Sequence, residues 1–153
     1  MTNFFSSADG RQLKGRWYWN IDTPESFEEG DYVIISSSRQ DQIHRQGVAL
    51  ILNKNIANSM INYNVISERI VSIEIDTTKG PLTIFQIYAP DCNYSDNDID
   101  IFYDQIQNEI NKLSRRHKYL ILGDLNAKVG ANCHKNWPTV AGKFSIGTTN
   151  DRG

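Results

Sequence analysis

The sequence predicts a mixed α/β domain built from stacked layers. Short stretches rich in valine, isoleucine and leucine recur between residues 31 and 123, and such stretches indicate β-strands. Residues 95–113 repeat apolar side chains at spacings of three and four, which is the spacing of one helix face. Apolar residues make up 39% of the 153 residues, enough for the core of one domain. The predicted order is strand, strand, hairpin, helix, strand.

The first two strands follow residues 1–30, where no period is clear and an irregular N-terminal segment is expected. Residues 31–38, "DYVIISSS", contain the β-branched residues that are typical of a short strand. Residues 47–54, "GVALILNK", are nearly all apolar, so we expect a strand that is buried on both faces.

A hairpin and a helix come next. In residues 68–90, "ERIVSIEIDTTKGPLTIFQIYAP", apolar and polar residues alternate before a Gly-Pro turn, which predicts two antiparallel strands. Ser95 or Asp96 can cap the helix that follows. One apolar stripe then runs along this helix, made of Ile99, Phe102, Ile106, Ile110 and Leu113.

Polar residues end the last predicted strand, residues 118–123, which we expect to be buried. In "YLILGDLNAKVG", Asp124 and Asn126 follow Gly123, and loop structure is expected from Ala127 onward. A carboxylate suits Mg²⁺ or Mn²⁺, and an amide both donates and accepts hydrogen bonds, so the pair can hold a phosphate oxygen and orient a water molecule. A Gly-Asp pair after a strand is also typical of a turn in which the Asp side chain binds the backbone two residues on. The short motif alone leaves both interpretations open.

A tyrosine lies at the end of the strand that precedes the helix. The residue is Tyr88, in "QIYAP", and a tyrosine at such a position usually lies in the core or at its rim. If neighbouring strands end at the same edge of the sheet, Tyr88 lies near Asp124, and its hydroxyl can contact a phosphate.

Charge and cysteine content restrict the class of protein. The net charge of -2 and the pI near 5.9 do not describe a strongly basic nucleic-acid binder, although a local basic groove is compatible with them. Cys92 and Cys133 stand alone without the spacing of a zinc site, and they fit a reducing, intracellular compartment. We expect neither a signal peptide nor a transmembrane segment.

Several stretches, taken together and in order, resemble the endonuclease/exonuclease/phosphatase superfamily, which includes DNase I and the endonucleases of non-LTR retrotransposons. They are "HRQGVALILNK", "ERIVSIEI", "IYAP", "FYDQIQ", "LILGDLNAKVG" and "WPTVAGKFSIGTTNDRG". The nearest resemblance is to the retrotransposon-derived branch, which includes craniofacial-development-protein-2-like sequences. It covers roughly residues 30–153, and the combination of motifs is more specific than any one of them.

The resemblance implies a fold, a function and a set of roles. Residues 31–153 would be a partial domain, truncated at the C-terminus, from a four-layer DNase I-like sandwich with mixed, largely antiparallel sheets. The family hydrolyses phosphodiesters, here of DNA, with Mg²⁺ or Mn²⁺, and a transposon endonuclease acts in the nucleus. By resemblance, Asp124 positions or activates water, Asp124 and Asn126 contact the metal, and Asn126 and Tyr88 hold the phosphate. Arg69 matches a recurrent arginine on a central strand and would bind phosphate, with a structural ion pair as the alternative.

Other positions depart from the family pattern. Lys14, in "KGRW", stands where this branch carries a metal-binding glutamate, and an ammonium group cannot bind Mg²⁺. Nearby acids fit no pattern and are expected to be solvated loop residues: Glu25, Glu28 and Glu29. No closing Asp-His pair is found, because the histidines precede or immediately follow the "GDLN" motif: His44, His117 and His134. We therefore expect an incomplete domain with little or no activity, whose truncated sheet exposes apolar faces.

Three functions remain open from the sequence. The first is a Mg²⁺-dependent endonuclease domain of retrotransposon origin that is incomplete. The second is a non-catalytic relic or nucleic-acid-binding module, which Lys14 favours. The third is a phosphomonoesterase of the same superfamily.

Overall fold

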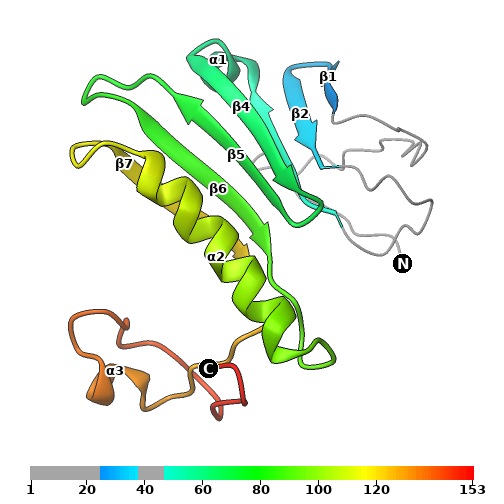
Figure 1. The fold of residues 1–153 in the computed structure, drawn as a ribbon. Coiled ribbons are helices and arrows are strands. Elements are labelled where there is room, and N and C mark those ends of the chain that lie inside the picture. The colour runs from blue at the N-terminus through cyan, green and yellow to red at the C-terminus, as the bar shows by residue number, and fades with distance from the viewer. Residues whose placement is uncertain (1–24, 38–46) are drawn as a thin grey trace.

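The computed structural model of the chain describes residues 25–37 and 47–153. Within these residues, two sheets and one long helix form three layers (Figure 1). The strands are β1 (Glu25–Glu29), β2 (Tyr32–Ser36), β3 (Ala49–Asn53), β4 (Met60–Ser67), β5 (Ile70–Ile75), β6 (Leu82–Tyr88) and β7 (Lys118–Asp124). The helices are α1 (Lys54–Ala57), α2 (Asp96–Lys112) and α3 (Cys133–Asn136). The predicted α/β class with mixed, largely antiparallel sheets is confirmed.

The first sheet has three antiparallel strands in the order β1-β2-β3. The turn between β1 and β2 contains Gly30, whose φ of +58° lies in the left-handed region that glycine adopts readily. The second sheet has four strands in the order β4-β5-β6-β7. β5 and β6 form the predicted antiparallel hairpin, whereas β6 and β7 are parallel and are connected through α2.

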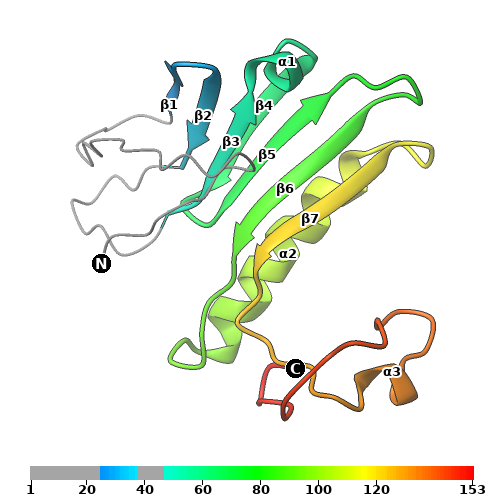
Figure 2. The same ribbon diagram turned by 180° about the vertical axis from the view of Figure 1, so that it is seen from behind.

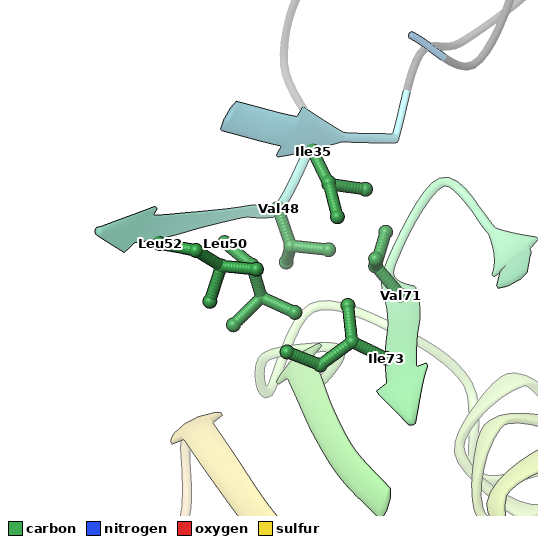
Figure 3. Close-up of a cluster of buried hydrophobic side chains, with 6 residues drawn as sticks. All are labelled: Ile35, Val48, Leu50, Leu52, Val71 and Ile73. Atoms are coloured by element: carbon green, nitrogen blue, oxygen red, sulfur yellow. The ribbon is translucent and has the colours of Figure 1, made fainter. Parts of the chain in front are cut away.

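The two sheets pack face to face around an apolar cluster. Side chains from β2, β3 and the adjacent Val48 point towards side chains of β5 (Figure 3). The cluster consists of Ile35, Val48, Leu50, Leu52, Val71 and Ile73, with Ile84 and Tyr88 of β6 packed against it. Burial of this apolar surface fixes the first sheet on one face of the second.

Helix α2 covers the opposite face of the second sheet. Ser95 caps it as predicted, and its hydroxyl accepts a hydrogen bond from the Asp98 backbone N–H (3.2 Å). The predicted stripe faces the sheet: Ile99, Phe102 and Ile106 are buried, and Ile110 and Leu113 are half-buried. The contact residues on the sheet are Ile70, Phe85, Ile87 and Ala89.

Four details of the sequence prediction are wrong. β1 lies inside the segment expected to be irregular, of which residues 1–24 are outside the described part, and β4 was not expected at all. β3 is not buried on both faces, because its residues alternate between buried and half-buried positions. β7 is exposed along its whole length rather than buried, because it is the last strand of the sheet as described.

The segment after β7 is mostly irregular, as expected, with α3 as a single helical turn. Cys92 and Cys133 are both free thiols. Among the described residues, no helix is both long and apolar enough to cross a membrane.

Candidate functional site

The parallel pairing of β6 and β7 brings two of the predicted site residues together. Tyr88 and Asp124 are partners in the last pair of this ladder, and both strands end at the same edge of the sheet (Figure 2). Residues paired in this way project to the same face. The predicted proximity of Tyr88 and Asp124 is therefore confirmed, while their chemical roles stay predictions.

Gly123 permits this close approach. Its φ is +141°, and a Cβ atom at this position would overlap the carbonyl oxygen of Ile87 and lie 2.8 Å from the carbonyl carbon. A side chain is thus excluded for both steric and conformational reasons. Ile87 and Gly123 pair directly before Tyr88 and Asp124, so this contact sets the spacing of the strand ends.

The loop after Gly123 contains the Gly-Asp turn that the sequence offers as the alternative to a phosphate site. The Asn126 backbone N–H donates to Asp124 Oδ1 at 2.9 Å, which is an Asx turn. The turn uses one lone pair of one carboxylate oxygen, and the Asp124 side chain is exposed. A carboxylate has about four acceptor positions, so the turn fixes this loop without consuming the carboxylate.

Asn126 is held in an unusual conformation. Its φ of +50° makes it the one non-glycine residue with positive φ in the described part. Its Nδ2 donates to the Ala89 carbonyl oxygen at 2.7 Å, and the Ala89 N–H donates to the Asp124 carbonyl oxygen at 2.9 Å. The amide is thereby oriented, and Oδ1 has no hydrogen-bond donor among the described residues. This oxygen and the second N–H are available to a ligand.

Arg69 lies below this edge in the turn between β4 and β5, not within a strand as the resemblance implied. It is 7% exposed, and its Nη1 donates to the Tyr88 carbonyl oxygen at 3.1 Å. The guanidinium carbon lies 5.3 Å from the Tyr88 ring centroid and 4.8 Å from that of Tyr94. These are cation–π distances. No ion pair to Arg69 occurs among the described residues, so the structural alternative gains no support there.

The described residues offer Mg²⁺ an open site at most. No group of three or more His, Cys, Asp or Glu side chains that could hold a metal ion occurs in the described part. Asp124 brings a carboxylate and Asn126 an amide oxygen, which are hard oxygen ligands. Mg²⁺ bound by these two would take its remaining ligands from water and substrate phosphate. The donor set fits the metal only in that open form.

The remaining acids and histidines have separate surroundings. Glu28 lies on β1 rather than in a loop, and it pairs with Lys54 Nζ at 3.0 Å. His117 Nε2 lies 2.8 Å from the Thr83 hydroxyl, and His134 Nδ1 lies 2.7 Å from the Ala141 carbonyl oxygen. Lys14, His44 and the side chain of Glu25 lie outside the described residues.

Sequence reasoning missed three residues around this edge: Tyr94, Asn150 and Arg152. Asn150 Nδ2 donates to the Asn126 carbonyl oxygen at 3.1 Å, and Arg152 Nη1 pairs with Asp96 at 2.7 Å. In the sequence, Asn150 and Arg152 belong to the terminal "NDRG", which carries part of the family resemblance but no local pattern that predicts these contacts. No local pattern marks Tyr94.

An open hollow of about 560 Å³ lies elsewhere, lined by residues 58–61 and 76–78. Residues 76–78 follow β5, whose end pairs with the start of β6, so the hollow lies at the opposite end of the sheet from Asp124. The predicted site residues lie at the converging strand ends and not among the residues that line this hollow.

Comparison with known proteins finds relatives of one kind. The chain is 32% identical over 114 residues to craniofacial development protein 2 of Bos taurus, and equally to the protein of that name from Tragulus javanicus. Each match covers 74% of this chain and 19% of the relative, so the chain spans about a fifth of the length of these curated relatives. No family model matches the chain. The chain is a distant relative of craniofacial development protein 2 over most of its own length.

Proposed function

We propose that the chain carries the phosphate-binding edge of a DNase I-like phosphodiesterase domain of retrotransposon origin. In this proposal it binds the backbone of DNA at this edge and cleaves it weakly or not at all. The observation that carries the proposal is the convergence of Tyr88, Asp124 and Asn126 at one strand edge above the buried cation of Arg69. The similarity to craniofacial development protein 2 and the order of the family motifs support it.

The residues divide the work of holding a phosphodiester. Within the described residues, Arg69 has one side-chain hydrogen bond, which leaves N–H donors for an anion. A buried guanidinium with spare donors favours an anionic ligand, because an uncompensated buried charge is costly. The free N–H of Asn126 and the Tyr88 hydroxyl would hold two further phosphate oxygens. Asp124, exposed beside them, would accept a proton from an attacking water molecule or orient it.

Mg²⁺ belongs to the proposal through the family resemblance. Asp124 and the Asn126 amide oxygen would hold it, and the ion would neutralise charge that develops on the phosphate. Because the described residues supply this pair of ligands without a larger acidic cluster, we expect little catalysis.

Nicking of supercoiled plasmid by the purified chain tests the proposal. Reactions with Mg²⁺ or Mn²⁺ are compared with reactions in chelator, and the Asp124→Ala variant is the control. Nicking that needs metal and disappears in the variant would show that the site is catalytic. Salt-dependent DNA binding without nicking would show a retained phosphate site. The proposal fails if a sample that melts cooperatively does neither.

The second candidate is a non-catalytic nucleic-acid-binding module. The spare N–H donors of Arg69 favour it, since they bind phosphate without any metal. In this case DNA binding is unchanged by chelator and by Asp124→Ala, and it weakens when Arg69 loses its charge. The lack of response to chelator and to Asp124→Ala separates the module from the enzyme, because the loss of the Arg69 charge weakens binding in both cases.

A further inference from the structure

The C-terminal segment folds back onto the loop that carries Asn126. Residues 147–153 run beside residues 126–131, and we call residues 147–153 the clasp. The contacts along it are Ala131 N–H to Gly147 O (3.0 Å), Thr149 Oγ1 to Val129 O (3.2 Å) and Asn150 N–H to Lys128 O (3.1 Å). Figures 1 and 2 both show this segment beside the loop that follows β7, below the start of α2.

Asn150 is the centre of the clasp. Its Oδ1 accepts from the Lys128 backbone N–H at 2.8 Å and from the Arg152 backbone N–H at 3.3 Å. Its Nδ2 donates to the Asn126 carbonyl oxygen at 3.1 Å. The Asn150 side chain therefore connects the loop that carries Asn126 to the clasp. Its amide oxygen accepts hydrogen bonds from the backbone, and its amide nitrogen donates one to Asn126.

Arg152 connects the clasp to the far side of the site. Its Nη1 pairs with Asp96 Oδ1 at 2.7 Å, and its Nη2 donates to the Tyr94 carbonyl oxygen at 3.4 Å. The Tyr94 ring in turn lies against Arg69. A continuous set of contacts thus runs from Asn126 through the clasp to the buried cation.

The contacts of the clasp help to hold Asn126 in its positive-φ conformation. A non-glycine residue with positive φ persists only where its surroundings determine it strongly. The Asx turn and Ala89 hold Asn126 from the sheet side, and Asn150 holds its carbonyl group from the opposite side of the loop. Asn150 thus adds a contact on the backbone carbonyl of Asn126, and without it only the Asx turn and the Ala89 carbonyl would hold this residue.

We propose that Asn150 is a positioning residue, which acts through Asn126 to aim the amide of that side chain at the bound phosphate. The inference rests on the proposed function, because it assigns a supporting role at the same site. Its structural half, the effect of Asn150 on Asn126, is measurable without any ligand.

The experiment uses the full chain with two variants and a control. Asn150→Ala removes both halves of the side chain, whereas Asn150→Asp keeps the acceptor for Lys128 and Arg152 and loses the donor to Asn126. Asn132→Asp is the control, because it makes the same change in the same loop region, where Asn132 has no side-chain capping hydrogen bond. The probes are the ¹H–¹⁵N signals of Asn126 and the affinity for a short DNA duplex across a salt series.

We expect the Asn126 side-chain signal to shift in both Asn150 variants and to stay in place in the control. We expect Asn150→Ala to weaken DNA binding by about tenfold. This is the effect of losing one well-placed hydrogen bond from the Asn126 amide to the charged phosphate. The salt dependence of the affinity should not change, because no charge is removed. A weaker affinity with an unchanged salt dependence separates a positioning role from a loss of cationic contacts.

Unchanged Asn126 signals in both variants would overturn the inference. So would altered signals with unaltered DNA affinity. If the unmodified chain binds no DNA while the signals move, the proposed function fails and the structural half stands. If a variant does not fold, the unmodified chain decides: a nuclear Overhauser contact between the Asn150 amide protons and Asn126 is required, and its absence refutes the inference.

Discussion

Gly123 shows how a single residue determines the geometry of the site. Its backbone occupies a region closed to side chains and packs directly on the Ile87 carbonyl group. The next residue along the chain is Asp124, so any shift of Gly123 moves the carboxylate away from Tyr88.

We predict that Gly123→Ala lowers the free energy of unfolding by about 3–5 kcal/mol, the sum of backbone strain and overpacking. Urea denaturation measures the change. Gly142→Ala is the matched control, because a Cβ atom at Gly142 meets nothing within 4 Å. Equal stability of the two variants would show that the strand ends are not as close as described.

Arg69 should contribute charge to DNA binding through its guanidinium. We predict that Arg69→Met lowers the slope of log affinity against log salt by about 1, and that Arg69→Lys does not restore binding because it lacks the planar group. Arg115→Met removes the same charge from the exposed turn before β7, at the opposite end of that strand from Asp124, and should change the slope less. An equal loss from both variants would mean that DNA responds to net charge alone.

The sequence predicted the places of candidate site residues correctly where they lie at the ends of recognisable strands. The sequence predicts that Tyr88 lies near Asp124 if neighbouring strands end at the same edge, and the parallel register of β6 and β7 meets that condition. Asn150 and Arg152 could not be found this way. Their partners are 22 to 58 residues away, and the contacts depend on how an irregular loop folds back.

At the scale of elements, helix α2 connects the two parallel strands, and its first turn contacts the clasp beside the candidate site. Its capping box joins Ser95 and Asp98, and the neighbouring Asp96 receives Arg152. The cap thus stabilises the helix start and, through Asp96, the clasp.

We predict that Ser95→Ala destabilises the chain by about 1 kcal/mol, since the first turn loses its side-chain acceptor. Thermal or urea unfolding followed by circular dichroism measures it. Asn97→Ala, at an exposed position of the same turn, serves as the control. A Ser95 variant as stable as this control would argue against the cap.

Elements with a clear period were predicted, and those without one were missed. The stripe of α2 and the β5–β6 hairpin follow from spacing alone. β4 escaped because register shifts between Met60 and Asn62 and between Val65 and Ser67 interrupt its two-residue period. β1 is rich in glutamate, which strands disfavour, and only the Gly30-Asp31 turn marks it as part of a hairpin.

At the scale of the whole molecule, the second sheet is covered unevenly. The first sheet and α2 bury the middle strands, whereas Tyr119, Leu120, Ile121 and Leu122 of β7 are each 38–50% exposed. β7 is also an edge strand of the described sheet, so one side of its backbone has no partner strand there. The same strand carries the exposed apolar side chains. This combination favours self-association. The apolar exposure expected from the sequence is therefore present along β7.

We predict that Leu120→Lys lowers self-association measured by sedimentation velocity and changes the free energy of unfolding by less than about 1 kcal/mol, because the side chain is already 45% exposed. Val140→Lys tests whether any exposed apolar residue has this effect, since Val140 is 83% exposed and lies outside the sheet. Association that falls equally in both variants would remove the role of the edge strand.

In the proposed function, the strand edge at Tyr88 and Asp124 binds a nucleic-acid phosphate. Titration of the ¹⁵N-labelled chain with a short DNA duplex tests it most directly, with chemical-shift changes recorded residue by residue. We expect salt-dependent shifts concentrated at Tyr88, Ala89, Asp124 and Asn126. Shifts confined to the hollow at residues 58–61 and 76–78, or no shifts in a folded sample, would contradict it.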